Sequence, residues 1–335
     1  MKVFMIGGTG LLGSSGAFQL IAKGHEVVTL SLPDIPKGCL LPKEMKIETG
    51  NYMDLSDFEI EKYMTGMDGF VFAAGIDDRV SGDYPVYDLY KKYNNDPLER
   101  MLRIAKKVGV KHVVVLGSYF VHFAKVWKDI DLYNDNPYIR SRVDQENMAL
   151  SYADQNMSVA VLELPYIFGV QKGRRPVWTI LVDNILSMPK VTMFPKGGTT
   201  MVSVRQVGEC IVGALENTKG GKAYPVGYYN MEWTDMLKIF HKYMGCPDKP
   251  IKTIPTFLFS LSQVGPRRKM RKASKEAGLD MVKFAKAMAR NMFIDKDIIV
   301  NELGAKDDDI EKAIGESIKL SMDAINGKEM VDMKL

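Results

Sequence analysis

Three glycines near the start of the chain have the spacing that binds a phosphate group. Gly7, Gly10 and Gly13 follow an apolar run at 3–6, and apolar residues at helical spacing come after them. In a turn between a strand and a helix, such glycines permit the tight turn, the approach of backbone N–H groups to a pyrophosphate and close packing of helix on strand. The spacing therefore predicts a dinucleotide-binding turn, and the alternative is an empty structural turn.

Alternating strands and helices must position this turn. The predicted buried strands cover 3–6, 26–30, 46–49, 69–75, 112–116 and 159–164, and the predicted helices cover 56–64, 94–108 and 138–155. Near-continuous apolar strands separated by helices are typical of a parallel sheet covered on both faces. The pattern thus predicts an α/β fold with a doubly wound parallel sheet, the Rossmann fold.

The regular alternation of predicted strands and helices ends after residue 165, where prolines and glycines cluster. We therefore assign residues 1–165 to the dinucleotide-binding domain. Residues 166–335 are assigned to a smaller, mostly helical substrate-binding domain. The stretch 200–216 is a candidate to rejoin the first domain.

The composition excludes several classes of protein. A chain of 335 residues with 46% hydrophobic and 26% charged residues is typical of a globular protein rather than a disordered or collagen-like one. Its 45 basic and 41 acidic residues leave a net charge of +4, too small to indicate nucleic acid as the main partner. Three scattered cysteines and four histidines predict no metal site and no disulfide framework. With no signal peptide and no apolar run of about 18 residues, we expect a cytoplasmic protein without a membrane span.

A series of short motifs along the chain resembles the extended short-chain dehydrogenases/reductases. Besides the glycine turn, the motifs lie at 50–54, 73–75, 94, 117–123, 138–142, 162–169, 293–295 and 303–304. Together they resemble the NAD-dependent epimerase/dehydratase family over nearly the whole chain. The motif at 165–169 looks more like the reductase and hydroxysteroid-dehydrogenase members than the nucleotide-sugar enzymes. The resemblance implies an NAD(P)-dependent oxidoreductase.

The resemblance also implies which residues contact the cofactor. They are Gly7, Thr9, Gly10, Leu11, Leu12, Gly13, Ser31, Asn51, Tyr52, Ala73, Ala74, Gly75, Gly117, Tyr138, Arg142, Pro165, Tyr166, Ile167 and Phe168. NAD-preferring members carry an acidic residue at the end of the second strand, where this chain has Ser31. Serine accepts either a hydroxyl or a phosphate, and Lys37 is near enough in sequence to neutralise a phosphate. We therefore favour NADP, with NAD as the alternative.

For the chemistry, the resemblance assigns proton transfer to Tyr138. Ser118 would orient the substrate oxygen, and Asn94 takes the place of the family's helix asparagine. Arg142 stands where the family has lysine, one helical turn from Tyr138. It supplies the charge that lowers the pKa of a phenol, but it cannot release a proton. The alternatives are that Tyr138 and Arg142 only hold the cofactor or lie on the helix surface, and that Ser118 only caps the next segment.

Three departures from the nucleotide-sugar members bear on the substrate. Tyr166 and Glu163 replace an asparagine and an arginine, and Thr199 replaces the arginine that grips a diphosphate. The candidates to substitute for that arginine are Arg174, Arg175 and Arg205. We therefore expect a small to medium apolar ketone, enone or alcohol as substrate. The residues expected to face it are His122, Tyr166 and Trp178.

Two other functions remain open. One is a nucleotide-sugar epimerase or dehydratase that retains its NAD, and the other is a dinucleotide-binding regulatory protein that has lost catalysis. Family members often dimerise through the helices that correspond to 94–108 and 138–155, so a homodimer is implied. The basic run at 267–272, beside the apolar stretch 257–261, is either a membrane-surface contact or a solvated helix.

Overall fold

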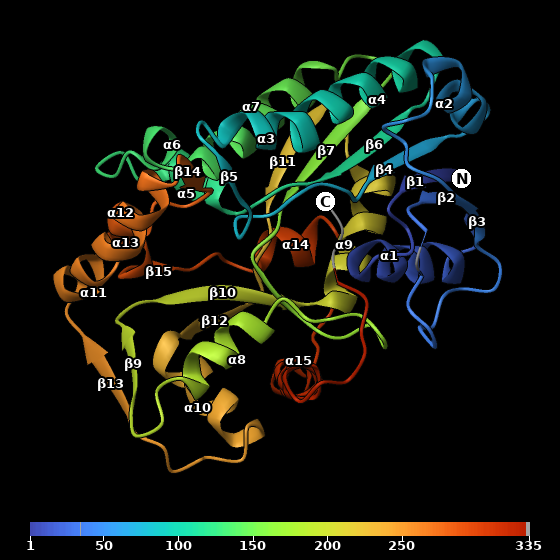
Figure 1. Ribbon diagram of the computed structural model, residues 1–335. Coiled ribbons are helices and arrows are strands. Elements are labelled where there is room, and N and C mark those ends of the chain that lie inside the picture. The colour runs from blue at the N-terminus through green and yellow to red at the C-terminus, as the bar shows by residue number, and fades with distance from the viewer. Residues whose placement is uncertain (34, 333–335) are drawn as a thin grey trace.

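The centre of the molecule is a seven-stranded parallel sheet (Figure 1). The computed structural model describes residues 1–33 and 35–332. The strands lie in the order β11-β7-β6-β4-β1-β2-β3. Their bounds are β1 (Lys2–Ile6), β2 (Glu26–Ser31), β3 (Lys46–Thr49), β4 (Gly69–Phe72), β6 (His112–Leu116), β7 (Ser158–Glu163) and β11 (Gly221–Pro225). The predicted doubly wound sheet is confirmed. Chain order reverses between β1 and β4, and ligands bind such sheets in the crevice at that point.

Successive residues of β1 point to opposite faces of the sheet, and both faces are buried. Val3 and Met5 belong to one apolar core with α1 (Leu11–Ala22) and α9 (Val204–Asn217). Phe4 and Ile6 belong to a second core with α2 (Asp57–Met64) and α4 (Asp96–Lys107). Figure 1 shows α4 and α7 (Pro137–Ser151) over one face and α1 and α9 over the other. Burial on both faces explains why the strand is apolar at each of its positions 3–6.

The predicted helix at 94–108 is wrong at its start. This region forms α3 (Tyr87–Tyr90), a π-helical turn (Lys91–Asn95) and then α4. Pro97 has no N–H group, so the α-helical hydrogen bond to the residue four positions earlier is missing there. Asn94 therefore lies in the π-helical turn. The other two predicted helices match more closely. Helix α2 begins directly after the predicted cap at Ser56, and α7 covers most of the predicted range 138–155 but ends at Ser151.

The residues after 165 build smaller sheets. Strand β10 (Gly198–Ser203) pairs with β8 (Tyr166–Phe168), β12 (Tyr229–Glu232) and β15 (Asn291–Met292). Two strand pairs lie apart from it, β9 (Thr192–Pro195) with β13 (Ile251–Ile254) and β5 (Ser81–Asp83) with β14 (Lys275–Ala277). The large sheet also takes β11 from this region, and α9 packs on α1. The domain boundary at 165 stays a prediction.

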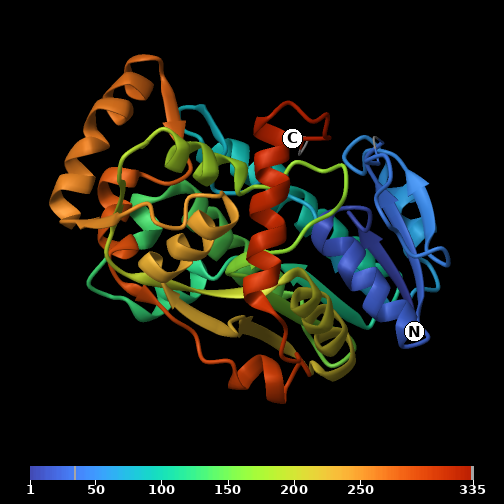
Figure 2. The ribbon, with the colours of Figure 1, turned by 90° about the horizontal axis from the view of Figure 1, so that it is seen from below.

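The remaining helices are α5 (Phe120–Val126), α6 (Leu132–Asp135), α8 (Thr179–Leu186), α10 (Trp233–Tyr243), α11 (Thr256–Ser262), α12 (Val264–Lys272), α13 (Met281–Met288), α14 (Asp297–Asn301) and α15 (Ile310–Ile325). They lie on the smaller sheets or, as α5 and α14 do, against strands of the large sheet. Figure 2 shows α15 along the middle of the molecule, where it packs on α8 and α10. In the described part of the chain, no helix has the length and apolar character needed to cross a bilayer. The basic run lies in the exposed α12, and its membrane contact, the cytoplasmic location and the homodimer stay predictions.

Replacing Gly208 with valine tests the contact between α1 and α9. A Cβ at Gly208 would lie 2.6 Å from Ser15 Oγ and 2.7 Å from the Ser15 carbonyl oxygen. Overpacking of this kind costs about 1–3 kcal/mol, so the free energy of unfolding in a urea titration should fall by that amount. The control is Gly265→Ala in α12, where a Cβ would meet nothing within 4 Å and stability should hold or rise. An unchanged stability of the Gly208 variant would contradict the packing described.

Candidate active site

The glycine turn between β1 and α1 is shaped so that backbone alone can approach a ligand. Gly7 has φ +86°, and a Cβ there would lie 2.6 Å from the Ala73 carbonyl oxygen. A Cβ at Gly13 would lie 2.3 Å from the Gly7 carbonyl oxygen. In the part of the chain that the structure describes, no side chain caps the start of α1. The N–H groups of Leu11 and Leu12, in its first turn, have no partner within the helix. The residues present therefore fit a pyrophosphate at this helix end.

The end of β2 borders the same turn. Thr29 Oγ1 accepts a hydrogen bond from Gly8 N–H at 2.9 Å, and Ser31 Oγ accepts one from Thr9 N–H at 3.3 Å. The two hydroxyl oxygens are 3.1 Å apart. Ser31 thus lies beside the turn, at the position where NAD-preferring members carry an acidic residue.

The other residues predicted to contact a cofactor follow the strands at the same edge of the sheet. Ala73, Ala74 and Gly75 follow β4, Gly117 follows β6 and Pro165 follows β7. Asn51 closes a local turn, in which its side chain bonds Met53 N–H at 3.1 Å and Asp54 at 3.0 Å. Tyr52 is buried and packs edge-on against Phe72, and its contact with a cofactor stays a prediction.

Tyr138 and Arg142 meet through their side chains on α7. Arg142 Nε donates a hydrogen bond to the Tyr138 hydroxyl oxygen at 3.2 Å. The guanidinium also donates to Gln145 Oε1 at 2.7 Å and to the Ile76 carbonyl oxygen at 3.3 Å. Both residues are buried, so neither is an ordinary helix-surface residue. Ser118, which follows β6, lies near enough to lower the pKa of Tyr138.

Asn94 bonds Ile76 in the loop after β4, and Ile76 in turn accepts a hydrogen bond from Arg142. Its side chain accepts from Ile76 N–H at 2.7 Å and donates to the Ile76 carbonyl oxygen at 3.0 Å. Gln145 Nε2 donates to the Asn94 carbonyl oxygen at 2.7 Å. Asn94 and Gln145 therefore position Ile76 and Arg142. Gln145 was not among the residues predicted from the sequence, and its one signal is its place three residues after Arg142 on α7.

Burial, more than the nearby charges, determines the pKa of the Tyr138 hydroxyl. Burial raises the pKa of Tyr138. Arg142 and Ser118 lower this pKa and Asp78 raises it, and the pKa stays above the ordinary value of tyrosine. The pKa of Asp78 is itself raised to about 6, by burial first and then by Asp77. Sequence reasoning missed Asp78, whose only local signal is an acidic residue three positions after the Ala73-Ala74-Gly75 turn.

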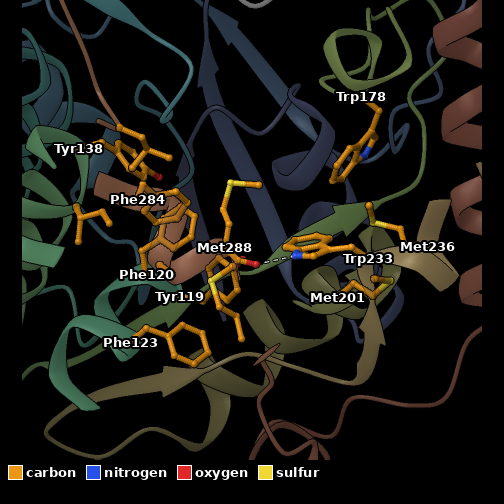
Figure 3. Packing of buried hydrophobic residues seen from close by; sticks show 14 of the residues in the cluster. Tyr119, Phe120, Phe123, Tyr138, Trp178, Met201, Trp233, Met236, Phe284 and Met288 are labelled. Atoms are coloured by element: carbon orange, nitrogen blue, oxygen red, sulfur yellow. Dashed lines mark hydrogen bonds between the residues drawn. The ribbon is translucent and has the colours of Figure 1, made fainter. Parts of the chain in front are cut away.

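Aromatic side chains line the region next to Tyr138 (Figure 3). The Phe120 ring lies edge-on to Tyr138 at 6.4 Å and to Phe284 at 5.2 Å. Tyr166 is half-buried and lies 5.3 Å from Trp178. Phe168 is fully buried and stacks on Trp178 at 4.2 Å, so its side chain belongs to the core rather than to the wall of a site. The Trp178 indole donates to the carbonyl oxygen of Ile167 at 3.0 Å.

His122 and Thr199, two residues that bear on the predicted substrate, differ in how firmly their surroundings hold them. His122 Nδ1 lies 3.9 Å from Glu163 Oε2, and Lys125 bonds both Glu163 and Glu146. Burial, with a further contribution from Glu146, raises the pKa of Glu163. Thr199 is fully buried, and its hydroxyl oxygen is 3.0 Å from the Tyr119 hydroxyl oxygen.

Gly10→Asp tests whether this turn holds a dinucleotide. A carboxylate at the start of α1 would occupy the pyrophosphate position and repel it. We expect calorimetric titration with NADPH or NADH to show no binding by the variant. Its far-ultraviolet circular dichroism should match that of the unmodified protein, because among residues 1–33 and 35–332 a Cβ at Gly10 would meet the Gly7 carbonyl oxygen alone, at 3.2 Å. Undiminished affinity in a folded variant would contradict the assignment.

Comparison with known proteins agrees with this geometry. The model of a family described as the NAD dependent epimerase/dehydratase family matches residues 3–227. An uncharacterized protein of Saccharomyces cerevisiae (strain ATCC 204508 / S288c), YLL056C, is 26% identical over 254 residues, which cover 74% of this chain and 82% of the yeast protein.

Solved structures share the fold at low sequence identity. The crystal structure of gox2253 has a TM-score of 0.74 at 18% identity and covers 98% of this chain and 99% of its own. PA4631, a nucleoside-diphosphate-sugar epimerase from Pseudomonas aeruginosa, has a TM-score of 0.69 at 15% identity, over 98% and 99% of the two chains. MoeE5 in complex with UDP-glucose and NAD has a TM-score of 0.65 at 16% identity, over 97% and 100%. From the family match over two thirds of its length, the chain belongs to the NAD dependent epimerase/dehydratase family.

Proposed function

We propose that this chain is an NAD(P)-dependent oxidoreductase acting on the carbonyl or alcohol group of a small to medium apolar substrate. NADP(H) is the favoured cofactor. The observation that carries the proposal is the Tyr138 hydroxyl, 3.2 Å from Arg142 Nε and beside Ser118 at the ligand-binding edge of the sheet. When bound, the nicotinamide supplies or accepts a hydride at the substrate carbon.

Tyr138 would handle the proton at the substrate oxygen. Since its pKa lies above the ordinary value, the hydroxyl is protonated at neutral pH and is ready to donate. Ser118 would hold the same oxygen by a hydrogen bond, and Arg142 would stabilise the phenolate left after donation. This protonation state favours reduction of a carbonyl over oxidation of an alcohol.

The environment of Arg142 supports catalysis over a purely regulatory role. All three nitrogens of its guanidinium donate hydrogen bonds, and one of them is aimed at the oxygen of Tyr138. A buried charge costs free energy unless its bonds are satisfied, so this orientation is maintained at the reacting group. Arginine replaces the charge of the family's lysine but not its ability to release a proton.

Three features support an apolar substrate over a nucleotide diphosphate. Thr199 is buried and bonded to Tyr119, so it offers nothing to a diphosphate. Arg205, a candidate substitute for the missing arginine, is paired with Glu209 and Asp308. The aromatic residues near Tyr138 are neutral and offer no charge to a diphosphate.

A nucleotide-sugar epimerase or dehydratase is the second candidate. The fold shared with PA4631 and MoeE5 supports it, but sequence identities of 15% and 16% are evidence for the fold alone and not for the substrate. Such an enzyme retains its NAD through the cycle. Co-purified NAD and a rise in melting temperature with a sugar nucleotide would favour it.

Tyr138→Phe tests the proton step. The variant keeps the ring but loses the hydroxyl proton, so we expect kcat for carbonyl reduction to fall by a factor of about 10² to 10⁴, whereas dinucleotide affinity should fall far less. The matched control is Tyr133→Phe on α6, where the hydroxyl bonds Asp144 at 2.8 Å, and its kcat should be unchanged. Equal loss in both variants, or none in either, would remove Tyr138 from the mechanism.

Asp78→Asn tests the charge balance around Tyr138. Above pH 6 the wild-type carboxylate is ionised and raises the pKa of Tyr138. Without that charge, the alkaline loss of kcat/KM for reduction should begin at lower pH in the variant. Well below pH 6, where Asp78 is protonated, the two pH profiles should differ much less. An alkaline limb that does not move would show that Asp78 does not act on the proton donor.

A further inference from the structure

A loop from the second half of the chain reaches back to the glycine turn. Gln171, between β8 and α8, donates from Nε2 to the Thr9 carbonyl oxygen at 3.0 Å and to Ser14 Oγ at 3.2 Å. Arg174 Nε donates to Gln171 Oε1 at 2.6 Å, and Arg174 Nη2 lies 3.5 Å from the Thr9 carbonyl oxygen. Gln171 therefore fixes the Arg174 guanidinium beside the turn.

The loop after β2 meets this second loop. A Cβ at Gly173 would lie 2.9 Å from the Lys37 carbonyl oxygen, so the two backbones touch. A Cβ at Gly38 would lie 3.5 Å from Lys172 Cε, so that side chain lies over the loop after β2. Arg174 and two lysines, Lys37 and Lys172, thus come from the two loops that border Thr9.

Arg174 is a half-buried cation without a carboxylate partner among residues 1–33 and 35–332. Burial lowers the pKa of Arg174. A charge placed in this way is normally compensated by an anion. The N–H groups of the first turn of α1 already provide for the pyrophosphate, whereas Thr9 is bonded to Ser31 at the end of β2. In this fold, the end of β2 is where the 2′ position of the adenosine ribose is recognised.

We propose that Arg174, assisted by Lys37 and Lys172, binds the 2′-phosphate of NADP(H) and thereby selects NADP(H) over NAD(H). The inference rests on the proposed dinucleotide-dependent function and adds the residue that discriminates between the two cofactors. Arginine suits this role because its planar fork bonds two phosphate oxygens at once. No arginine follows Ser31 directly in the sequence, so Arg174 would provide the guanidinium contact to the 2′-phosphate from a distant loop.

The test is a calorimetric titration of cofactor-stripped Arg174→Gln with NADPH, NADH, 2′,5′-ADP and 5′-AMP. Charge-assisted bonds of this kind predict at least a roughly tenfold loss of affinity for NADPH and 2′,5′-ADP. Affinity for NADH and 5′-AMP should change less than about twofold by the same reasoning. The control is Arg175→Gln, an exposed neighbour 3.8 Å from Asp332, which should bind all four ligands as the wild type does. Lys37→Gln provides a second variant should Arg174→Gln fail to fold, and it should weaken NADPH alone.

The outcomes separate this inference from the proposed function. Equal weakening of NADPH and NADH would place Arg174 at the pyrophosphate, and no change in either would remove it from the site. Both results overturn the inference and leave the proposed function standing. A wild-type protein that binds neither dinucleotide would overturn the proposed function itself.

Discussion

The hydrogen bond from Arg142 to the Tyr138 hydroxyl is the interaction on which the site depends. It requires a buried guanidinium, and the fold satisfies that guanidinium through Gln145 and the Ile76 carbonyl oxygen. Ile76 is in turn held on both sides by Asn94. The π-helical turn that contains Asn94 and the loop after β4 are therefore parts of one network. Disturbing any member should move the proton donor relative to the glycine turn.

Features governed by neighbours in sequence could be predicted, and those governed by distant contacts could not. The glycine turn, the strands β1 to β7 of the large sheet and the pairing of Tyr138 with Arg142 depend on local spacing. The π-helical turn depends on Pro97. The spacing of apolar residues in the sequence does not show where the π-helical turn gives way to the α-helix. The place of Asp78 beside Tyr138 and of Gln171 and Arg174 beside Thr9 depends on loops that meet only in the folded chain. Burial of Phe168 and Tyr52 likewise follows from packing against distant side chains.

Contacts outside this network bear on the choice between an apolar carbonyl and a sugar nucleotide. Charges that would hold a diphosphate are neutralised elsewhere, as at Arg205, or replaced by buried hydroxyls, as at Thr199. Arg174, in contrast, lies beside the glycine turn, bonded to Gln171 and 3.5 Å from the Thr9 carbonyl oxygen. The fold is shared with nucleotide-sugar enzymes, but the side chains that would grip their substrates are absent from the matching positions of the described chain.

The most direct measurement is the stoichiometry of the cofactor against product. Purified protein would be incubated with NADPH and a panel of apolar ketones and enones, and in a parallel reaction with NAD and sugar nucleotides. The absorbance of the reduced nicotinamide and the amount of product would be measured in both reactions. We expect one molecule of NADPH to be oxidised for each molecule of alcohol or saturated ketone formed. Conversion of a sugar nucleotide with no net change in cofactor would contradict it.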